Sequence, residues 1–511
     1  MVSKQKNVLS RRKFFKLFGS MGMAGVAASV VGCSKDAVGG KGWMPGQYQV
    51  PGNWPVQVKG RIPIDPANPS IVRDDRKCIL CGQCLEVCEK VQTVYGYYEL
   101  PVKKDITCVN CGQCTLWCPT AAITERDENQ NVLQALNDPK LHVVIQTAPA
   151  TRVSIGEEFG LPPGSVVEGK QVAALKKLGF NAVFDTNFTA DVTIMEEATE
   201  LLHRIDQGGS LPQFTSCCPG WVKFCEYYYP DLLGNLSSVK SPQQILGVLA
   251  KTYYSEKQGI PPENIVSVAV MPCTAKKFEC RRPEMNTAGK QAGKSGMQDV
   301  DMILTTRELA RLIKSRNIDL NRLENAGYDH LMGESSGAGV IFGATGGVME
   351  AAVRTLYFLV TKQRPPEELL QFSAVRGLNG VKEAEVSIPG KGNLKVAVCH
   401  GLKNARIILE KVRAGNSPWS FIEFMGCVGG CIGGGGQPRI SLTSMDEVKQ
   451  ARIAGLYELD GRVYKKRASF ENQKVQTLYE DYLGYPGSEL AETLLHTHFT
   501  DRSKDLTVKK I

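Results

Sequence analysis

The sequence is short of long hydrophobic runs and, after its first residues, of net charge. Its weakly apolar stretch at residues 17–32 is sixteen residues long, fewer than the ~20 that a membrane-spanning helix needs. Six of the nine excess positive charges come from Lys and Arg in residues 1–32, a segment without Asp or Glu. The remaining excess of three gives no reason to expect nucleic-acid binding. Hydrophobic residues at 42% and charged residues at 22% are typical of a soluble globular protein, here long enough for about three domains.

The N-terminal segment predicts export. Residues 10–16, Ser-Arg-Arg-Lys-Phe-Phe-Lys, resemble the twin-arginine motif, an address that the Tat translocase reads. With the apolar stretch that follows, they predict a signal peptide over residues 1–33 and a periplasmic protein. Cys33 follows Val-Val-Gly as in a lipoprotein cleavage site, which would add a lipid anchor; ordinary cleavage after a small residue is the alternative. Residues 34–71, rich in Gly and Pro, are predicted to be a linker and lead-in.

Most of the 17 cysteines are clustered, which favours metal binding over disulfides. Residues 72–125 contain the spacing C-x₂-C-x₂-C-x₃-C twice, the pattern of bacterial ferredoxins, in which the fourth cysteine binds the other cluster. This predicts an α+β ferredoxin-like domain with two [4Fe–4S] clusters that conduct single electrons. Zinc is the alternative, and a doubled run of four cysteines disfavours it. The two predicted ligand sets are Cys78, Cys81, Cys84 and Cys118, and Cys88, Cys108, Cys111 and Cys114.

From residue 142 short apolar strands alternate with helices, which predicts parallel sheets covered by helices. The strands are expected at residues 142–146, 181–185, 265–271, 301–305, 394–398 and 421–425. The helices are expected at residues 170–178, 192–206, 241–258, 306–315, 347–359 and 402–413. Residues 442–505 are polar and predicted to be helical at 446–456, 472–482 and 488–495.

Three loops carry further cysteines. The glycine-rich run at residues 424–438 contains Cys427 and Cys431, residues 215–221 contain Cys217 and Cys218, and residues 271–279 contain Cys273. Glycine lets the backbone approach a bound group closely, and thiolates are the preferred ligands of iron–sulfur clusters. Loops at the carboxyl ends of strands can meet at one point of an α/β fold. A flexible loop or a phosphate cradle is the alternative for the glycine run alone.

These three loops resemble the signature motifs of the iron-only ([FeFe]) hydrogenases, and the resemblance extends over about residues 61–502. It implies an H-cluster domain over residues 140–441, a small-subunit-like helical region over 442–505, and reversible oxidation of H₂. The implied H-cluster is a [4Fe–4S] cubane joined to a diiron unit with CO, CN⁻ and azadithiolate. By motif match the cubane ligands are Cys218, Cys273, Cys427 and Cys431, with Cys431 bridging to the diiron unit.

The resemblance also implies roles for residues around the cluster. Cys217 would pass protons, Lys276 would hydrogen-bond a cyanide, and a proton relay would run through Glu197, Ser237 and Glu200, with Ser238 as the alternative serine. The implied cavity-lining residues are Met271, Met425, Gln243 and Phe342. Gly426, Val428 and Ala150 depart from the usual family residues.

Residues outside these motifs are expected to be structural. Cys225, Cys280 and Cys399 have no partner cysteine nearby in a motif, so they are predicted to be small buried hydrophobes. His496 and His498 lie in the C-terminal region and are predicted to pack rather than to bind metal.

Three other functions share part of this pattern: a hydrogen sensor, a non-catalytic iron–sulfur assembly paralogue and a simple electron carrier. Retention of Cys217 disfavours the sensor, and the complete ligand set disfavours the assembly paralogue. The carrier would need no diiron pocket. The expected partners are H₂, protons, maturation proteins and a periplasmic or membrane-bound electron carrier such as a ferredoxin or a cytochrome.

Overall fold

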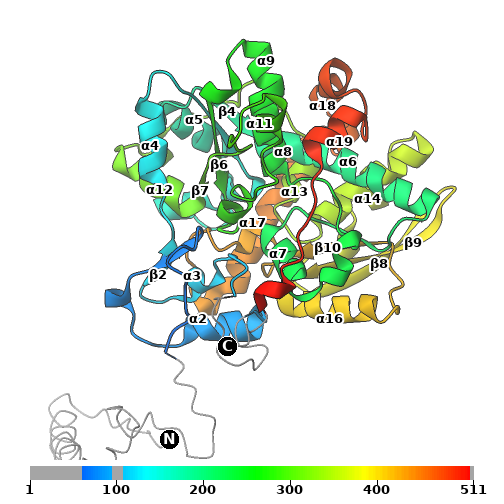
Figure 1. Cartoon of the computed structure of the whole chain (residues 1–511), viewed down its shortest axis with the longest axis horizontal. Helices are drawn as coiled ribbons and strands as arrows, with labels where there is room; N and C mark the ends of the chain where they lie inside the picture. The colour runs from blue at the N-terminus through cyan, green and yellow to red at the C-terminus, as the bar shows by residue number, and fades with distance from the viewer. Residues whose placement is uncertain (1–59, 95–106, 507–511) are drawn as a thin grey trace, which may run out of the picture. The chain divides into compact units, whose positions relative to one another are not determined.

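A computed structural model of the chain describes residues 60–94 and 107–506 (Figure 1). The twin-arginine motif, Cys33 and most of the predicted linker therefore lie outside the described residues. No helix within the described ranges is long and apolar enough to cross a membrane.

The cysteine repeat folds into a small α+β unit. Strands β1 (Ile71–Arg73) and β2 (Ile123–Glu125) pair antiparallel, and helices α2 (Gln83–Glu86) and α3 (Gln113–Trp117) lie within the two cysteine motifs. Both helices begin after a glycine in the left-handed region, where glycine avoids the strain of a side chain. The predicted ferredoxin-like α+β architecture is confirmed.

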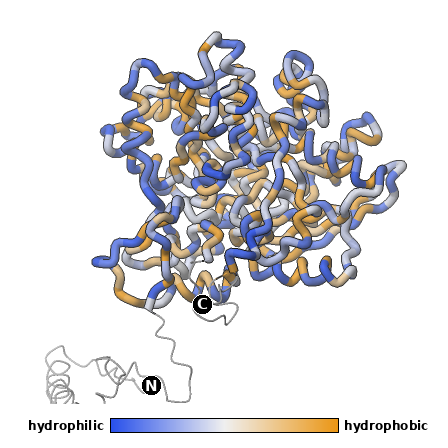
Figure 2. The backbone as a smooth tube through the Cα atoms, viewed as in Figure 1, coloured by the Kyte–Doolittle hydropathy of each residue, from blue (hydrophilic) through white to orange (hydrophobic). Residues whose placement is uncertain are grey.

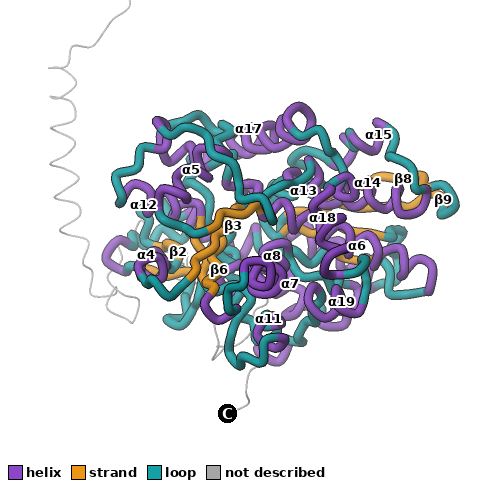
Figure 3. The backbone as a smooth tube through the Cα atoms, turned by 90° about the horizontal axis from the view of Figure 1, so that it is seen from above, coloured by secondary structure: helices purple, strands orange, loops and turns teal. Residues whose placement is uncertain are grey.

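A first sheet has the strand order β4-β3-β6-β7, and all of its neighbours are parallel. Its strands are β3 (His142–Thr147), β4 (Ala182–Asp185), β6 (Ile265–Met271) and β7 (Met302–Thr305). They are almost entirely buried, as expected for a parallel sheet with helices on both faces (Figure 3).

A second sheet has the order β5-β10-β9-β8. Strands β5 (Gln213–Phe214), β10 (Phe421–Met425) and β9 (Gly392–His400) are parallel, whereas β8 (Val381–Ile388) pairs antiparallel with β9. The strands expected at residues 394–398 and 421–425 are parallel, as predicted, whereas β5 and the antiparallel β8 were not expected from the sequence. The exposed Glu383, Glu385 and Ser387 of β8 alternate with less exposed residues, because one face of this edge strand meets solvent.

The central helix is α6 (Thr186–Gln207), which contacts α8 (Pro242–Leu249) and α14 (Gly347–Thr361). It starts six residues before the predicted residue 192, at an Asp185 cap whose carboxylate accepts the Asn187 N–H at 2.9 Å. Other helices covering the sheets are α5 (Glu168–Leu178), α7 (Pro219–Tyr228), α12 (Thr306–Ser315) and α16 (Leu402–Arg413). The helix predicted at 241–258 is interrupted by a π-turn at Ala250–Tyr254 before α9 (Ser255–Gln258).

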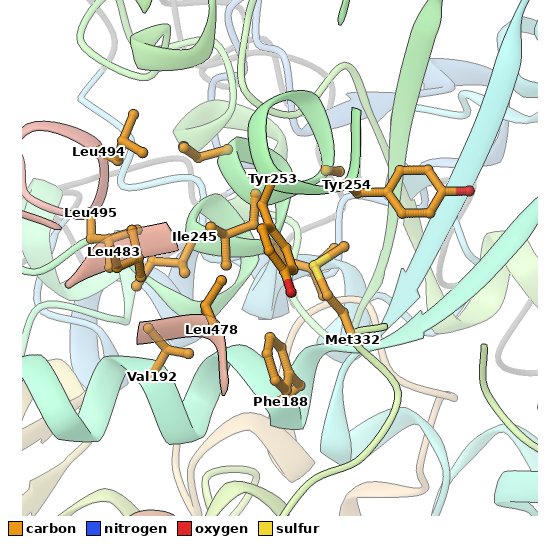
Figure 4. Packing of buried hydrophobic residues seen from close by; sticks show 14 of the residues in the cluster. Phe188, Val192, Ile245, Tyr253, Tyr254, Met332, Leu478, Leu483, Leu494 and Leu495 are labelled. Atoms are coloured by element: carbon orange, nitrogen blue, oxygen red, sulfur yellow. The ribbon is translucent and has the colours of Figure 1, made fainter. Parts of the chain in front are cut away.

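The C-terminal region is helical, as predicted, with α17 (Met445–Glu458), α18 (Gln473–Leu478) and α19 (Glu489–Leu495). Leu478 and Leu494 join a buried cluster with Val192 of α6 and Ile245 of α8 (Figure 4). Hydrophobic backbone segments lie mainly inside, and many outer turns are hydrophilic (Figure 2). The C-terminal helices thus complete the core around α6.

Candidate active site

The three cysteine loops meet where strands of both sheets end. Strand β6 ends two residues before Cys273, β10 ends two residues before Cys427, and β5 ends four residues before Cys218. The Gly426 N–H donates to Cys218 Sγ at 3.3 Å, which fixes two of the loops against each other. Burial, together with neighbouring thiols, raises the pKa of Cys273 to about 12 and also raises that of Cys427 and Cys431. Such thiols stay protonated unless a metal stabilises the thiolate.

The glycine run between the loops is closely packed. A Cβ at Gly430 would lie 2.6 Å from Thr345 N, one at Gly434 would lie 2.3 Å from Pro272 O, and one at Gly435 would lie 2.3 Å from Cys111 O. These spaces are too short for any side chain. The run is therefore a packed loop that contacts both the cysteine loop at residues 271–279 and the ferredoxin-like unit. This close packing excludes the flexible-loop alternative.

A cavity of about 550 Å³ opens beside the four cysteines. Alanine and proline side chains form much of its wall, so it is largely apolar. The wall also includes nine site residues named from the sequence: Cys217, Cys218, Cys273, Cys431, Met271, Met425, Gln243, Phe342 and Lys276. Gln243 contributes a buried Oε1 without a hydrogen-bond partner, an acceptor left open to a bound group.

Lys276 is a buried cation at the cavity wall. Its Nζ donates to Cys217 O at 3.0 Å and to Glu279 Oε2 at 2.9 Å. Burial lowers the pKa of Lys276, but the Glu279 carboxylate more than offsets it, so the pKa lies above its ordinary value. An ammonium held there can donate to an anionic ligand. Glu279, which orients Lys276 and also accepts from Gln243 at 3.3 Å, was missed in the sequence, although its i,i+3 spacing from Lys276 was a signal.

The two predicted relay carboxylates, Glu197 and Glu200, lie on one face of α6. Glu197 is buried, and burial with the charge of Glu200 raises its pKa to about 8. Ser237 donates from Oγ to Glu200 Oε2 at 2.6 Å, and it lies close enough to Glu197 to lower the pKa of that carboxyl group. The alternative serine, Ser238, contacts Glu200 through its backbone N–H at 3.2 Å and through Oγ at 3.4 Å. Both serines thus contact Glu200, but Ser237 makes the shorter hydroxyl contact and lies near Glu197.

The relay reaches the cavity at Cys217. Burial, followed by the charge of Glu197, raises the pKa of the Cys217 thiol well above its ordinary value. The thiol is therefore neutral and able to donate a proton near neutral pH.

The ferredoxin-like unit holds two separate groups of sulfurs. Cys78, Cys81, Cys84 and Cys118 line one cavity of about 310 Å³. The other group surrounds Cys111, whose pKa is raised by burial and then by the thiols of Cys88 and Cys108. Each group matches one of the sets expected from the crossed ferredoxin pattern.

The second sulfur group adjoins the catalytic loops. In addition to burial, Cys273 raises the pKa of Cys111, and Cys111 raises the pKa of Cys427, so these sulfurs lie near one another. Gln113 Nε2 donates to Cys427 Sγ at 3.2 Å and to Gly433 O at 2.8 Å. Sequence reasoning missed Gln113 because no local pattern marks a contact between segments more than 300 residues apart.

The remaining cysteines and histidines were predicted to pack in the interior, and the structure agrees for some of them only. Cys225, Cys280 and Cys399 are at most 2% exposed, as predicted for small hydrophobes. His498 is exposed, so the prediction that it packs is wrong. The His496 side chain packs inside, but both of its ring nitrogens have polar neighbours, Ser238 Oγ at 2.8 Å and Glu196 Oε2 at 3.3 Å.

Comparison with known proteins agrees with this geometry. Residues 141–435 match the family model for the C-terminal domain of the iron-only hydrogenase large subunit, and residues 446–502 match that of the iron hydrogenase small subunit. The chain is 45% identical to iron hydrogenase 1 of Clostridium pasteurianum, over 85% of this chain and 76% of that protein. It is 49% identical to the periplasmic [Fe] hydrogenase large subunit of Nitratidesulfovibrio vulgaris, over 64% and 76% respectively.

A solved [FeFe]-hydrogenase from Chlamydomonas reinhardtii superposes with a TM-score of 0.64 and 41% identity, covering 74% of this chain and 99% of that one. Cytosolic iron–sulfur assembly component 3 of Bos taurus is more distant, at 31% identity over 71% of this chain and 75% of that protein. The family-model match and the identities above 40% show that this chain belongs to the iron-only hydrogenases.

Proposed function

We propose that this protein interconverts H₂ with protons and electrons at an H-cluster bound by Cys218, Cys273, Cys427 and Cys431. The observation that carries the proposal is the convergence of four cysteines beside a cavity that also exposes a further thiol, an ammonium and an unpaired amide oxygen. A simple electron carrier has no use for such a cavity.

The residues fit the cofactor. Three of the four thiols have a raised pKa and need a metal to stabilise their thiolates, and the apolar cavity beside them excludes water. The bound cluster supplies the making and breaking of the H–H bond. Lys276 would donate to an anionic ligand in the cavity and Gln243 would accept or donate there, while Met271 and Met425 give soft apolar contact.

The protein's own part in catalysis is proton movement. Cys217 would exchange a proton with the cavity, and Glu197, with a pKa of about 8, would exchange one with Cys217. Ser237 would pass it between Glu197 and Glu200 through its hydroxyl. A carboxyl group whose pKa lies near neutrality can both give and take a proton, as such a relay needs.

The electron path would run through two [4Fe–4S] clusters. One would be bound by the cysteines next to Gln113 and the catalytic loops, and the other by the set that includes the exposed Cys81. An electron carrier, a ferredoxin or a cytochrome, would meet the exposed set. Resemblance to a periplasmic relative supports a periplasmic location. Tat export and a lipid on Cys33 remain proposals from the sequence, as do the proposed domains 72–125, 140–441 and 442–505.

One experiment tests the function against its alternatives. Chain matured with the dedicated maturation proteins should hold about fourteen irons, because three cubanes and a diiron unit add up to that number. It should show infrared bands of metal-bound CO and CN⁻ and evolve H₂ from a reduced dye. About eight irons without those bands would favour an electron carrier. The bands with little turnover would favour a sensor.

A further inference from the structure

His496, from the C-terminal helical region, lies beside the outer end of the proton relay. Its backbone forms an isolated antiparallel bridge with Val239. The Thr497 N–H donates to Ser238 O at 2.7 Å, and the Lys240 N–H donates to Leu495 O at 2.7 Å. These hydrogen bonds fix the imidazole next to the serine pair that contacts Glu200. The ring is not an incidental neighbour of the relay, because the backbone on both sides of it is paired.

Two hydrogen bonds and one longer ion-pair contact form a continuous chain of polar groups. Ser238 Oγ lies 3.4 Å from Glu200 Oε1 on one side and 2.8 Å from His496 Nδ1 on the other. His496 Nδ1 also lies 3.5 Å from an oxygen of Glu492, a carboxylate on α19 whose side chain is 56% exposed. The His496 side chain is only 8% exposed. The chain thus leads from a relay carboxylate to a carboxylate in solvent through one imidazole.

We infer that His496 carries protons between Glu200 and solvent, through Ser238 on the inside and Glu492 on the outside. This inference rests on the proposed hydrogenase function. During H₂ oxidation, the Ser238 hydroxyl gives its proton to His496 Nδ1 as it takes one from the Glu200 carboxyl. The imidazolium then releases the Nδ1 proton to the Glu492 carboxylate and from there to water. H₂ evolution uses the same steps in reverse, so no proton is gained or lost along the way.

The charges around the ring suit this role. Burial lowers the pKa of His496, but the hydrogen bond with Glu196 and the charges of Glu492 and Glu200 raise it above its ordinary value. The groups that face the ring or its partners are Glu196 and Glu200 of α6, Arg204 paired with Glu200, Tyr479 paired with Glu196, and Glu492 of α19. Glu196 holds the other ring nitrogen, which leaves Nδ1 for the transfer.

The decisive variant is His496→Gln, whose amide can keep polar contacts with Ser238 and Glu196 but cannot carry a proton. In matured full-length enzyme at low buffer concentration, we expect H₂ oxidation to fall about tenfold, a modest loss for an acid–base group because Glu200 keeps some solvent access. In wild type, the rate of H₂ oxidation should rise with pH as His496 titrates, and this rise should disappear in the variant. Imidazole added to the buffer should restore the rate. The exposed His498→Gln is the matched control and should behave as wild type.

Three measurements separate proton transfer from a structural role. The infrared bands and the thermal unfolding midpoint should stay those of wild type. In histidine-labelled protein, a ring that titrates above the ordinary pKa should vanish in His496→Gln and titrate lower in Glu492→Gln. Glu492→Gln leaves the ring in place and should lose rate with the same imidazole rescue, which decides the case if His496→Gln does not fold.

Two outcomes would overturn the inference. One is an unchanged rate and pH profile in both variants, which would place the exit at Glu200 itself. The other is a lower rate without imidazole rescue and with an unchanged pH profile, which would make His496 a structural residue. Failure of the proposed function is distinct, because wild type would then lack both the infrared bands and H₂ turnover.

Discussion

The sulfurs of this chain sit in two contrasting surroundings. In the ferredoxin-like unit Cys81 is exposed, and its neighbours Ile79 and Leu80 are 63% and 58% exposed. In the catalytic domain Cys273 and Cys427 are buried at the ends of strands from two sheets. An electron can cross a short gap to a partner, so the outer set needs access to a surface. Chemistry on H₂ and protons needs water excluded, so the inner set needs a closed cavity.

At the inner site, we expect one substitution to prevent cluster assembly and a substitution of the adjacent residue to lower turnover only. Cys218→Ala should prevent assembly of the inner cubane and destabilise the domain, because three thiols cannot satisfy the cluster. Cys217→Ala should keep the infrared bands of CO and CN⁻ but lower turnover by roughly 10² or more, the usual cost of removing a positioned acid–base group.

Iron content and infrared spectra of the two variants measure this difference. Near-normal turnover in Cys217→Ala would make that thiol a packing residue. Loss of iron from Cys217→Ala would instead place the ligand one position out of register.

Loss of a cysteine from the outer sulfur set should lower activity less than loss of Cys218. Cys81→Ala should cost one cluster, about four irons, while the catalytic infrared bands remain. Turnover with a protein electron carrier should fall strongly, because the carrier meets the exposed set. Turnover with a small reduced dye should fall less, since a dye can reach the second cluster.

A comparison of the two electron donors in one preparation measures the effect, with Cys399→Ala, a buried cysteine of a predicted packing role, as control. Equal losses with dye and carrier would contradict an outer entry point.

A buried ion pair connects the ferredoxin-like unit to the catalytic domain, and acid should weaken it. Arg307 Nε donates to Glu125 at 3.0 Å, and its Nη2 reaches Gly435 O at 2.8 Å. Burial raises the pKa of Glu125, but the charges of Arg307 and Arg311 outweigh it and lower the pKa to about 2. A carboxylate with a depressed pKa stabilises the fold above the unfolded-state value of about 4.3, and that stabilisation is lost as pH falls toward 2.

We therefore expect Glu125→Gln to remove up to about 3 kcal/mol of stability at pH 7 and to flatten the decline of stability below pH 4.5. Thermal unfolding of the two proteins across pH 3–7 checks this. Glu383→Gln, on the exposed face of β8, is the control. Parallel pH curves for wild type and Glu125→Gln would show that the pair contributes nothing specific.

Much of this organisation could be predicted, and the failures have physical causes. Cysteine spacing predicts the two sulfur sets as ligands, and apolar runs such as Ile265–Met271 correctly predict the buried strands. The start of α6 was missed because its first turns bury polar residues such as Asn187 and Asp191, which hide the apolar periodicity. The edge strand β8 was missed because its charges face solvent in alternation.

Long-range polar contacts could not be predicted from the sequence, for a different reason. Arg307, Gln113 and His496 each act on a residue more than 180 positions away. Their side chains have no local motif, and nothing in composition or periodicity links the two ends of such a contact. Only the packed fold brings them together, so motif reasoning found the ligands and missed the groups that connect them.

The smallest predicted effect concerns the hydrogen bond between the two regions. Gln113 Nε2 donates to Cys427 Sγ, and a hydrogen bond to a cluster sulfur stabilises the reduced, more negative state. Gln113→Leu should lower the reduction potential of the cubane bound by Cys427. Turnover should change by no more than about fivefold, because one neutral hydrogen bond contributes about 1 kcal/mol. Redox titration followed by electron paramagnetic resonance measures the potential. Gln113→Glu, which keeps the side-chain length but loses the donor and adds a negative charge, should lower the potential as well. If Gln113→Leu leaves the potential unchanged, the amide only holds Gly433, and the two regions are joined mechanically without tuning each other's electrons.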